Sequence, residues 1–94
     1  MIFIVYDSSE MISWVEKLGS FLRKENKPVE YDLIGRSLSK QISDAENKNA
    51  EFIIIFNLNE MKINGNVILR TKGEKTEKKL KADENFDEIN NVLL

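Results

Sequence analysis

The sequence contains no cysteine and no histidine. Without cysteine there is no disulfide framework, no thiol nucleophile and no thiolate zinc site. Without histidine there is no imidazole ligand and no Ser–His or Cys–His catalysis. An enzyme is therefore the least favoured class, because no nucleophile–base pair is available. We expect no cofactor and no metal either, since the spacing of Asp7, Asp32 and Glu60 does not favour a carboxylate metal site over chance.

Long apolar runs and an excess of positive charge are also missing. No apolar run approaches the ~20 residues of a membrane span. Residues 1–6 are apolar, but the run stops at Asp7 and no basic segment precedes it, so it is not a signal peptide. We therefore expect a cytoplasmic protein without a membrane partner. The 14 basic and 16 acidic residues give a net charge of −2, which disfavours non-specific coating of nucleic acid but leaves room for a local basic patch.

The length of 94 residues predicts a single domain over residues 1–94 with one hydrophobic core. We find no internal repeat and no linker. Met1 directly before the first expected strand favours a complete gene product over an excised domain.

The first half of the chain alternates strand and helix patterns. Short apolar runs at the start and in the middle predict strands buried on both faces, and the alternating segment between them predicts a strand near a sheet edge. Apolar gaps of three and four predict a helix that ends at Asn26 and Pro28, and Ser37 predicts the cap of a second helix. The expected elements are strand Ile2–Tyr6, helix 9–25, strand Val29–Leu33, a helix from Ser37 and strand Phe52–Phe56. This is a β-α-β-α-β unit with parallel strands in the order 2-1-3.

The second half predicts additions to that unit. Asn64-Gly65 between apolar segments indicates a tight hairpin, whose strands join the sheet beside the third strand. The lysines from Lys72 to Lys81 could contact phosphate, but the interleaved Glu74 and Glu77 favour a solvated, near-neutral connection. Within it, Thr76–Leu80 could form a polar edge strand. A last helix opens at residues 83–87. The expected fold class is a three-layer α/β/α domain with a mixed four- to five-stranded sheet, a β-hairpin and a C-terminal helix.

An ordered set of motifs resembles one known family. The set comprises LIGRSLSKQISDA at residues 33–45, the apolar run 52–56, Glu60, and Gly-x-Val-x-Leu-Arg at residues 65–70. It is similar to the anticodon-binding domain of class II aminoacyl-tRNA synthetases of the histidyl, prolyl, threonyl and glycyl group, and the similarity covers about residues 2–93. Asn26 and Asn57 stand where that family has glycine. Asparagine tolerates left-handed backbone, so the fold survives both changes. The family's catalytic domain does not fit in 94 residues, so we expect no aminoacylation.

The resemblance implies tRNA or another structured RNA loop as the partner. Phosphates are held by basic side chains or by helix N-terminal N–H groups, and loop bases are read at their edges. We expect one group, at the start of the second helix, to hold phosphate, and a second group to address base edges. The candidates are Arg36, Ser37 and Lys40 for phosphate, and Gln41, Glu60 and Arg70 for base edges.

Each candidate also has a structural interpretation. Ser37 is a helix cap in either case. Arg36 and Lys40 can be solvated helix residues, and Gln41 can cap or bridge. Glu60 can form an ion pair with Arg70. Outside this set, Trp14 on the apolar stripe favours core packing over base stacking, and Asp7 favours a helix cap over a binding role.

A second function stays open on the same fold: a protein-interaction module or accessory subunit that has lost RNA binding. The overall acidity and the scarcity of arginine, with Arg23, Arg36 and Arg70 alone, favour this alternative. We expect a homodimer or a complex with another protein, through apolar residues 92–94 and 61–63.

Overall fold

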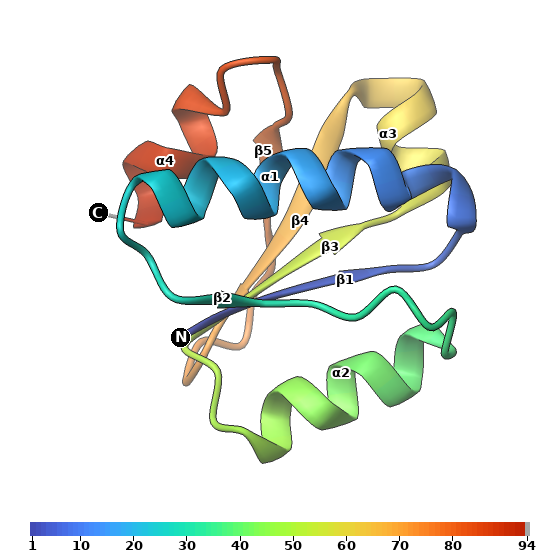
Figure 1. The fold of residues 1–94 in the computed structure, drawn as a ribbon, viewed down its shortest axis with the longest axis vertical. Helices are drawn as coiled ribbons and strands as arrows, with labels where there is room; N and C mark the ends of the chain where they lie inside the picture. Colours follow the sequence, from blue (N-terminus) through green and yellow to red (C-terminus); the bar gives the residue numbers. More distant parts are fainter. Residues whose placement is uncertain (94) are drawn as a thin grey trace.

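The structure, a computed structural model that describes residues 1–93, has three layers (Figure 1). A mixed sheet forms the middle layer. Helices α1 and α4 cover one face, α2 covers part of the other, and α3 lies at one end of the sheet. The elements are β1 (Ile2–Tyr6), the 3-10 helix η1 (Ser9–Met11), α1 (Ile12–Lys24), β2 (Val29–Glu30), α2 (Leu38–Asn47), β3 (Phe52–Phe56), α3 (Leu58–Asn64), β4 (Asn66–Thr71), β5 (Lys78–Lys81) and α4 (Asp87–Leu93).

The sheet has five strands in the order β2-β1-β3-β4-β5. The first three strands are parallel, β4 is antiparallel to β3, and β5 is antiparallel to β4. The register between β1 and β3 runs from Ile2 opposite Phe52 to Tyr6 opposite Phe56. The predicted order 2-1-3, with two more strands beside the third, is confirmed, and so is the α/β class with helices on both faces.

The predicted hairpin at Asn64-Gly65 is wrong, because helix α3 ends there. Asn57 caps this helix by accepting a hydrogen bond from the Glu60 N–H at 2.8 Å. Gly65 adopts the left-handed conformation, with φ of 66°, and its N–H donates to the Met61 carbonyl at 2.9 Å. A left-handed glycine is the usual end of a helix as well as part of a hairpin turn. The actual hairpin joins β4 to β5 through residues 72–77, and β5 is the predicted polar edge strand, shifted by one or two residues.

Strand β2 is shorter than the strand predicted from the sequence. The predicted strand Val29–Leu33 pairs with β1 only at Val29 and Glu30.

Asn26 is left-handed, with φ of 60°, as predicted for the helix end. Asn57 is extended, with φ of −94°, so it replaces glycine as a helix cap and needs no left-handed backbone.

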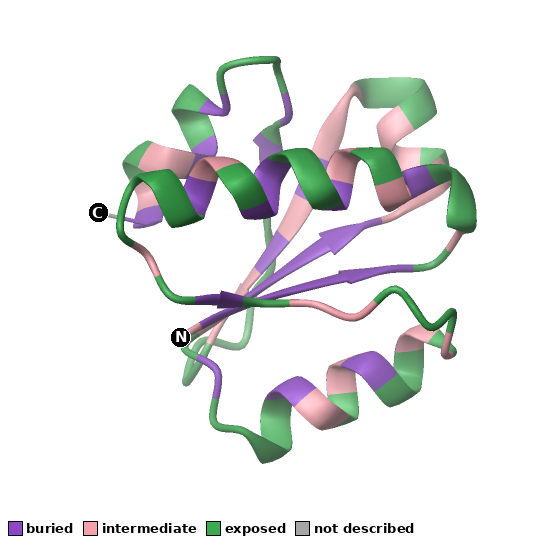
Figure 2. Ribbon diagram, in the orientation of Figure 1, coloured by how far each residue is buried: buried purple, intermediate pink, exposed green. Residues whose placement is uncertain are grey.

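The core lies on both sides of β1 and β3, which are almost wholly buried (Figure 2). The larger cluster lies under α1 and α4, and includes Ile4, Leu18, Phe56 and Ile89. Trp14 packs on its edge, with ring centroids 6.4 Å from Phe56 and 6.0 Å from Phe86, in line with the core interpretation. The smaller cluster lies under α2 and consists of Phe3, Val5, Ala45, Ala50, Ile53 and Ile55.

One glycine fixes the path of the chain after β2. A Cβ atom on Gly19 of α1 would lie 2.3 Å from a ring carbon of Tyr31. The missing side chain therefore lets this ring pack directly against the helix. The Arg23 guanidinium lies 5.1 Å from the same ring centroid, a cation–π distance.

The apolar surface differs from the predicted partner face. Leu93 is buried and Val92 half-buried, because α4 packs both against the α1-side core; Leu94 lies outside the described residues. Ile63 is exposed as predicted, but Met61 is half-buried. The other exposed large hydrophobic residues among residues 1–93 are Leu33 and Ile34. Within the same residues, no helix has the length and apolar character needed to cross a membrane.

Candidate nucleic-acid interface

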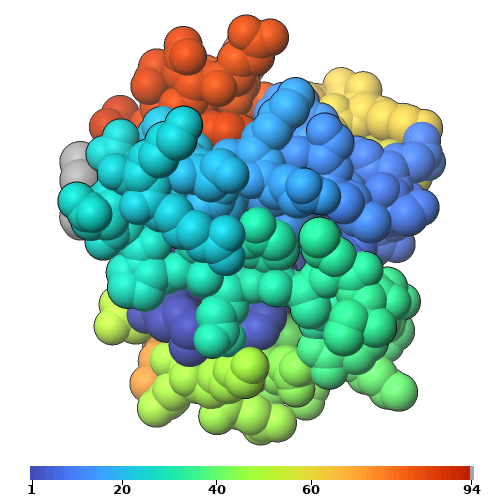
Figure 3. All heavy atoms as spheres, viewed as in Figure 1, coloured from blue at the N-terminus to red at the C-terminus, as the bar shows by residue number. Residues whose placement is uncertain are grey.

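The predicted site residues fall into two groups rather than one cluster. The first group lies on the segment between β2 and α2 and on the first turn of α2. This segment runs over the surface between α1 and α2 (Figure 3). The second group lies on α3 and β4. The members are Arg36, Ser37, Lys40 and Gln41 in the first group, and Glu60 and Arg70 in the second.

Gln41 is a buried structural residue, 1% exposed. Its Oε1 accepts from the Tyr6 N–H at 3.1 Å, and its Nε2 donates to the Tyr6 carbonyl at 2.9 Å and to the Arg36 carbonyl at 2.8 Å. Tyr6 lies beyond the point where β2 stops pairing with β1, so the Gln41 amide takes the place of the missing strand. Both amide N–H groups are used within the protein, and the predicted role at a base edge does not fit this burial.

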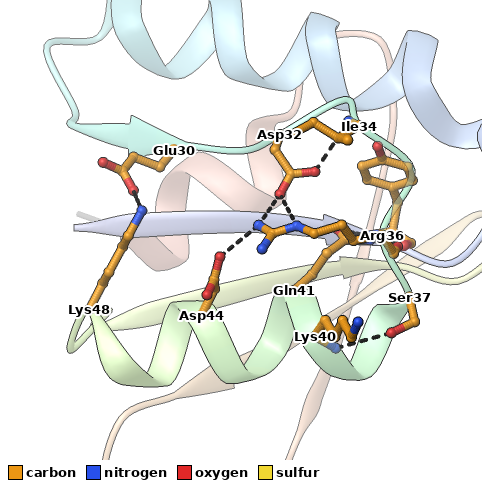
Figure 4. A network of polar contacts seen from close by, with 10 residues as sticks. Glu30, Asp32, Ile34, Arg36, Ser37, Lys40, Gln41, Asp44 and Lys48 are labelled. Atoms are coloured by element: carbon orange, nitrogen blue, oxygen red, sulfur yellow. Dashed lines mark hydrogen bonds and ion pairs between the residues drawn. The ribbon is translucent and has the colours of Figure 1, made fainter.

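The Arg36 guanidinium lies between two carboxylates (Figure 4). It forms an ion pair with Asp32, and its Nη2 lies 2.6 Å from an Asp44 oxygen. The hydrogen bond to Asp32, followed by that to Asp44, raises the pKa of the Arg36 side chain. Because one cation faces two anions, this cluster has a net charge of −1. The predicted phosphate would have to compete with both carboxylates.

The buried phenol of Tyr6 lies beside the segment that carries Asp32 and Arg36. Its hydroxyl lies near the Gly35 backbone, but within the described part of the chain it forms no hydrogen bond of normal geometry. Burial, and then the nearby charge of Asp32, raises the pKa of the Tyr6 phenol. The phenol therefore remains neutral at physiological pH, and adds no charge to the Arg36 cluster.

Ser37 and Lys40 lie on the first turn of α2. The Ser37 Oγ accepts from the Lys40 N–H, which confirms Ser37 as the helix cap. The Lys40 side chain is exposed and forms no ion pair with a described residue. Of the first group, Lys40 alone keeps a charge that an external anion can approach.

Glu60 lies on α3 and faces the strands that follow it. Its carboxylate accepts from the Asn64 side chain at 2.9 Å and from the Asn66 side chain at 3.4 Å. The Lys79 Nζ lies 3.1 Å from its other oxygen. The hydrogen bond from Asn64, and then that from Lys79, lowers the pKa of Glu60. The side chain is therefore ionised and can only accept hydrogen bonds.

Arg70 lies on β4 and does not reach Glu60. Its Nε lies 2.9 Å from a Glu77 oxygen, so the predicted Glu60–Arg70 ion pair is wrong. Two other pairs, Glu60–Lys79 and Arg70–Glu77, link α3 and β4 to β5 and its turn. All four side chains lie on the β4–β5 half of the molecule.

That half of the sheet is bare on the side of α2. The strand alternation of β4 and β5 directs Val67, Leu69 and Leu80 into the α1-side core. Their neighbours therefore face the α2 side, where the core is formed by β1, β3 and α2. These neighbours are Asn66, Ile68 and Arg70 on β4, and Lys79 and Lys81 on β5, and we call them the open face. Asn66, Ile68 and Arg70 are half-buried, and the two lysines are exposed.

Of these five residues, the predicted site contains only Arg70; Lys79 and Lys81 were interpreted as part of a solvated connection, and Asn66 and Ile68 were missed. The signal was present, because Asn66-Val67-Ile68-Leu69-Arg70 and Lys78-Lys79-Leu80-Lys81 place a polar or exposed position next to each buried one. A cavity of about 260 Å³ extends the open face toward the hairpin turn. It is lined by Glu46, Asn49, Ala50, Ile53, Arg70, Thr71, Lys72, Gly73 and Glu74.

Asp7 has a different role from the one predicted. Ser8 caps η1, whereas the Asp7 carboxylate accepts from the Asn57 side chain at 2.7 Å and from the Leu58 N–H at 3.0 Å. It therefore holds the start of α3, the helix that carries Glu60. Among residues 1–93, no group of three or more acidic side chains is placed to hold a metal ion.

A protein-family model identifies the family of this chain. The family model described as "Anticodon binding domain" matches residues 1–92. The chain belongs to this anticodon-binding domain family. A search of curated proteins finds no match.

Solved structures show the same fold in parts of larger proteins. A histidyl-tRNA synthetase from Nostoc sp. PCC 7120 superposes with a TM-score of 0.75 at 19% identity, over 96% of this chain and 21% of that one. A prolyl-tRNA synthetase from Cryptosporidium parvum gives a TM-score of 0.77 at 12% identity, over 98% and 21%. The RNA binding domain of threonyl-tRNA synthetase from Cryptosporidium parvum Iowa II gives 0.76 at 15% identity, over 86% and 20%. The chain thus spans about a fifth of each, and at these identities the likeness establishes the fold.

The open face of this anticodon-binding domain has a defined chemistry. Arg70 offers a planar fork of N–H donors, and Lys79 and Lys81 offer point charges. Asn66 adds an amide, and Ile68 supplies apolar surface. Glu60 of α3 is not part of the open face, but it lies beside it, in contact with Asn66 and Lys79, and adds acceptors. Phosphates and base edges are the groups that such a set can bind.

Proposed function

We propose that this domain binds a tRNA anticodon loop, or a similar RNA loop, through the open face. The observation that carries the proposal is the bare β4–β5 half of the sheet, where Arg70, Lys79 and Lys81 surround Ile68. Membership of the anticodon-binding family supports it. The proposed role is that of a non-catalytic, cytoplasmic binding module.

The mechanism follows from how single-stranded RNA is recognised. Loop bases are splayed out, pack on protein surface and are hydrogen-bonded at their edges. In our proposal, a base packs on Ile68, Arg70 donates to base acceptors, and ionised Glu60 accepts from a base amino group. Lys79, Lys81 and Lys40 hold phosphates. The Arg70–Glu77 ion pair is solvent-exposed, and such pairs contribute little to folding stability, so RNA can replace it at small cost. In the other pair Lys79 is exposed, whereas the Glu60 side chain is only 12% exposed.

The test is a titration of labelled anticodon stem–loop RNAs at low salt, about 50 mM, where phosphate contacts are strongest. Arg70→Ala should weaken binding about tenfold, because one base contact carries roughly 1–3 kcal/mol. Glu60→Gln should change which loop is preferred. Lys24→Ala, on the far side of α1, is the matched control and should bind as wild type. Absence of binding by the wild type, or equal binding by Arg70→Ala and Lys24→Ala, would overturn the proposal.

One observation favours the alternative, a protein-interaction module. Ile34 is 80% exposed and Leu33 is 45% exposed, next to each other on the segment between β2 and α2. Exposed neighbouring apolar side chains are typical of contact sites. If the domain binds no RNA, light scattering of the wild type and of Ile34→Ser tests this function, and self-association that the substitution abolishes would establish it.

A further inference from the structure

The only asparagine–glycine pair of the sequence, Asn64-Gly65, lies at the C-terminal end of α3. Every other asparagine is followed by a residue that carries a side chain. Asparagine is among the chemically labile residues, because its side-chain amide carbon is open to attack by the nitrogen of the next residue. Glycine has no Cβ atom and adopts many backbone conformations, so this attack meets the least hindrance at Asn64-Gly65.

The structure leaves the pair accessible to solvent. Ile63 and Asn64 are exposed, and none of the seven residues of α3 is fully buried. A Cβ atom built on Gly65 would meet no described atom within 4 Å, so no side chain covers the attacking residue. The Gly65 N–H donates to the Met61 carbonyl at 2.9 Å, and this bond has to open first. The exposed last turn of so short a helix opens at a small cost in free energy.

The reaction that this geometry permits is an attack of the Gly65 nitrogen on the Asn64 Cγ. A new C–N bond closes a succinimide ring, the bond between Cγ and Nδ2 breaks, and the amide leaves as ammonia with the proton of the Gly65 nitrogen. One water molecule then opens the ring at either carbonyl, which gives aspartate or isoaspartate. The net change is the uptake of one water and the release of one ammonia, so water is the only co-reactant.

We infer that Asn64 is a site of spontaneous deamidation, and that its product releases Glu60 from the position that Asn64 gives it. The Asn64 Nδ2 donates to a Glu60 oxygen at 2.9 Å, whereas the product carries a carboxylate without an N–H. Like charges four residues apart repel each other on a helix, and an anion at a helix C-terminus is opposed by the helix dipole. The modification therefore destabilises the end of α3.

The consequence for RNA rests on the proposed function. Glu60 is held beside the open face by Asn64, Asn66 and Lys79. Deamidation removes the first of these contacts and adds a negative charge where an RNA backbone would approach, which opposes binding. The unmodified domain is then the form that binds, and the deamidated domain is the weak form.

The first experiment follows the chemistry in the intact domain. Wild-type protein is incubated at physiological temperature and pH, digested with trypsin and measured by mass spectrometry, with fragmentation that distinguishes isoaspartate from aspartate. Asn59 is the internal control, because it is exposed on the same helix but is followed by a residue with a side chain. We expect aspartate and isoaspartate at Asn64 while Asn59 keeps its amide. An unchanged Asn64, equal conversion at both positions, or aspartate without isoaspartate would overturn the inference.

The second experiment measures what the new charge does. Asn64→Asp represents the product, Asn64→Gln keeps an amide, and Asn47→Asp adds the same charge at the exposed last residue of α2. In thermal unfolding we expect Asn64→Asp to be the least stable of the three, with a deficit that shrinks as salt screens the repulsion from Glu60. Equal stability of Asn64→Asp and Asn47→Asp would overturn the role given to the Glu60 contact.

The same variants are titrated with a labelled anticodon stem–loop at low salt. Asn64→Asp should bind about tenfold more weakly than Asn64→Gln, a loss the size of one base contact. Equal affinities would overturn the consequence for RNA while leaving the proposed function intact. No binding by the wild type would overturn the proposed function, and mass spectrometry and thermal unfolding would still decide the inference about Asn64.

Discussion

The two halves of the sheet face on the α2 side use similar polar residues in different ways. On the half that α2 covers, Gln41 of α2 is buried against β1, and Arg36, just before α2, is held between two carboxylates. On the open half, Arg70 forms an exposed pair with Glu77, and the exposed Lys79 reaches the largely buried Glu60 of α3. Helix α2 therefore decides the role: polar groups that it carries or pairs with complete the fold, and those beyond its reach remain available to a ligand.

The covered half needs these polar groups because β2 is short. Once β2 ends at Glu30, the edge of β1 loses its partner, and unpaired buried backbone groups are costly. Gln41 satisfies the edge at Tyr6, and Arg36 fixes the segment that passes over it. No such demand exists on the open half, where β4 and β5 satisfy each other.

Gln41→Ala should lower the free energy of unfolding by about 3 kcal/mol. The substitution removes three hydrogen bonds and leaves the Tyr6 N–H and two carbonyls unpaired, and each such loss costs about 1 kcal/mol or more. Urea denaturation measures the effect. Lys40→Ala, one residue away and exposed, should change stability by less than about 0.5 kcal/mol. If Gln41→Ala kept wild-type stability but lost RNA binding, the structural role assigned to the α2 half would be contradicted.

Arg36→Ala should lower stability by less than Gln41→Ala and leave RNA affinity unchanged. The substitution leaves Asp32 and Asp44 without their shared cation, and these carboxylates then repel each other. Thermal unfolding at low and high salt measures the stability effect, which should shrink as salt screens the repulsion. A loss of RNA affinity as large as that of Arg70→Ala would show that Arg36 contacts RNA after all.

The sequence predicts the sheet order well because the apolar runs of β1 and β3 can only be central strands. The sequence-based prediction of a hairpin at Asn64-Gly65 fails because a left-handed glycine ends a helix as readily as it makes a hairpin turn. The three-residue spacing of Leu58 and Met61, by which α3 packs on the core, is the helical signal in this segment.

The candidate site was predicted less well, because the hydrogen bonds and ion pairs of its side chains involve residues far apart in the sequence. Gln41 bonds to a residue 35 positions away, and Glu60 pairs with Lys79 on a strand whose register is set by the hairpin. Local patterns identify Ser37 as a cap, since its partner is three residues away. No local pattern shows that Gln41 is buried between α2 and β1 while Arg70 stays half-exposed.

The smallest expected effect is the pH dependence that Glu60 confers on folding. Its pKa lies below the ordinary value of 4.5, first because Asn64 donates to the carboxylate and then because Lys79 does. A carboxyl group with a lowered pKa stabilises the folded state above its unfolded pKa, and this contribution disappears as pH falls through the folded pKa. Glu60→Gln should therefore be less stable than wild type at pH 6, and the difference should shrink as the pH falls below 4.5 and through the lowered folded pKa.

Asn64→Ala provides the graded control for Glu60. It removes the first cause of the lowered pKa and keeps the Lys79 pair, so its acid unfolding curve should lie between those of wild type and Glu60→Gln. The measurement is urea denaturation at several pH values between 3 and 7. A difference between wild type and Glu60→Gln that persists unchanged at pH 3 would mean that the carboxylate charge is not the source of the stability. It would then also remove the reason to treat Glu60 as an ionised acceptor on the open half.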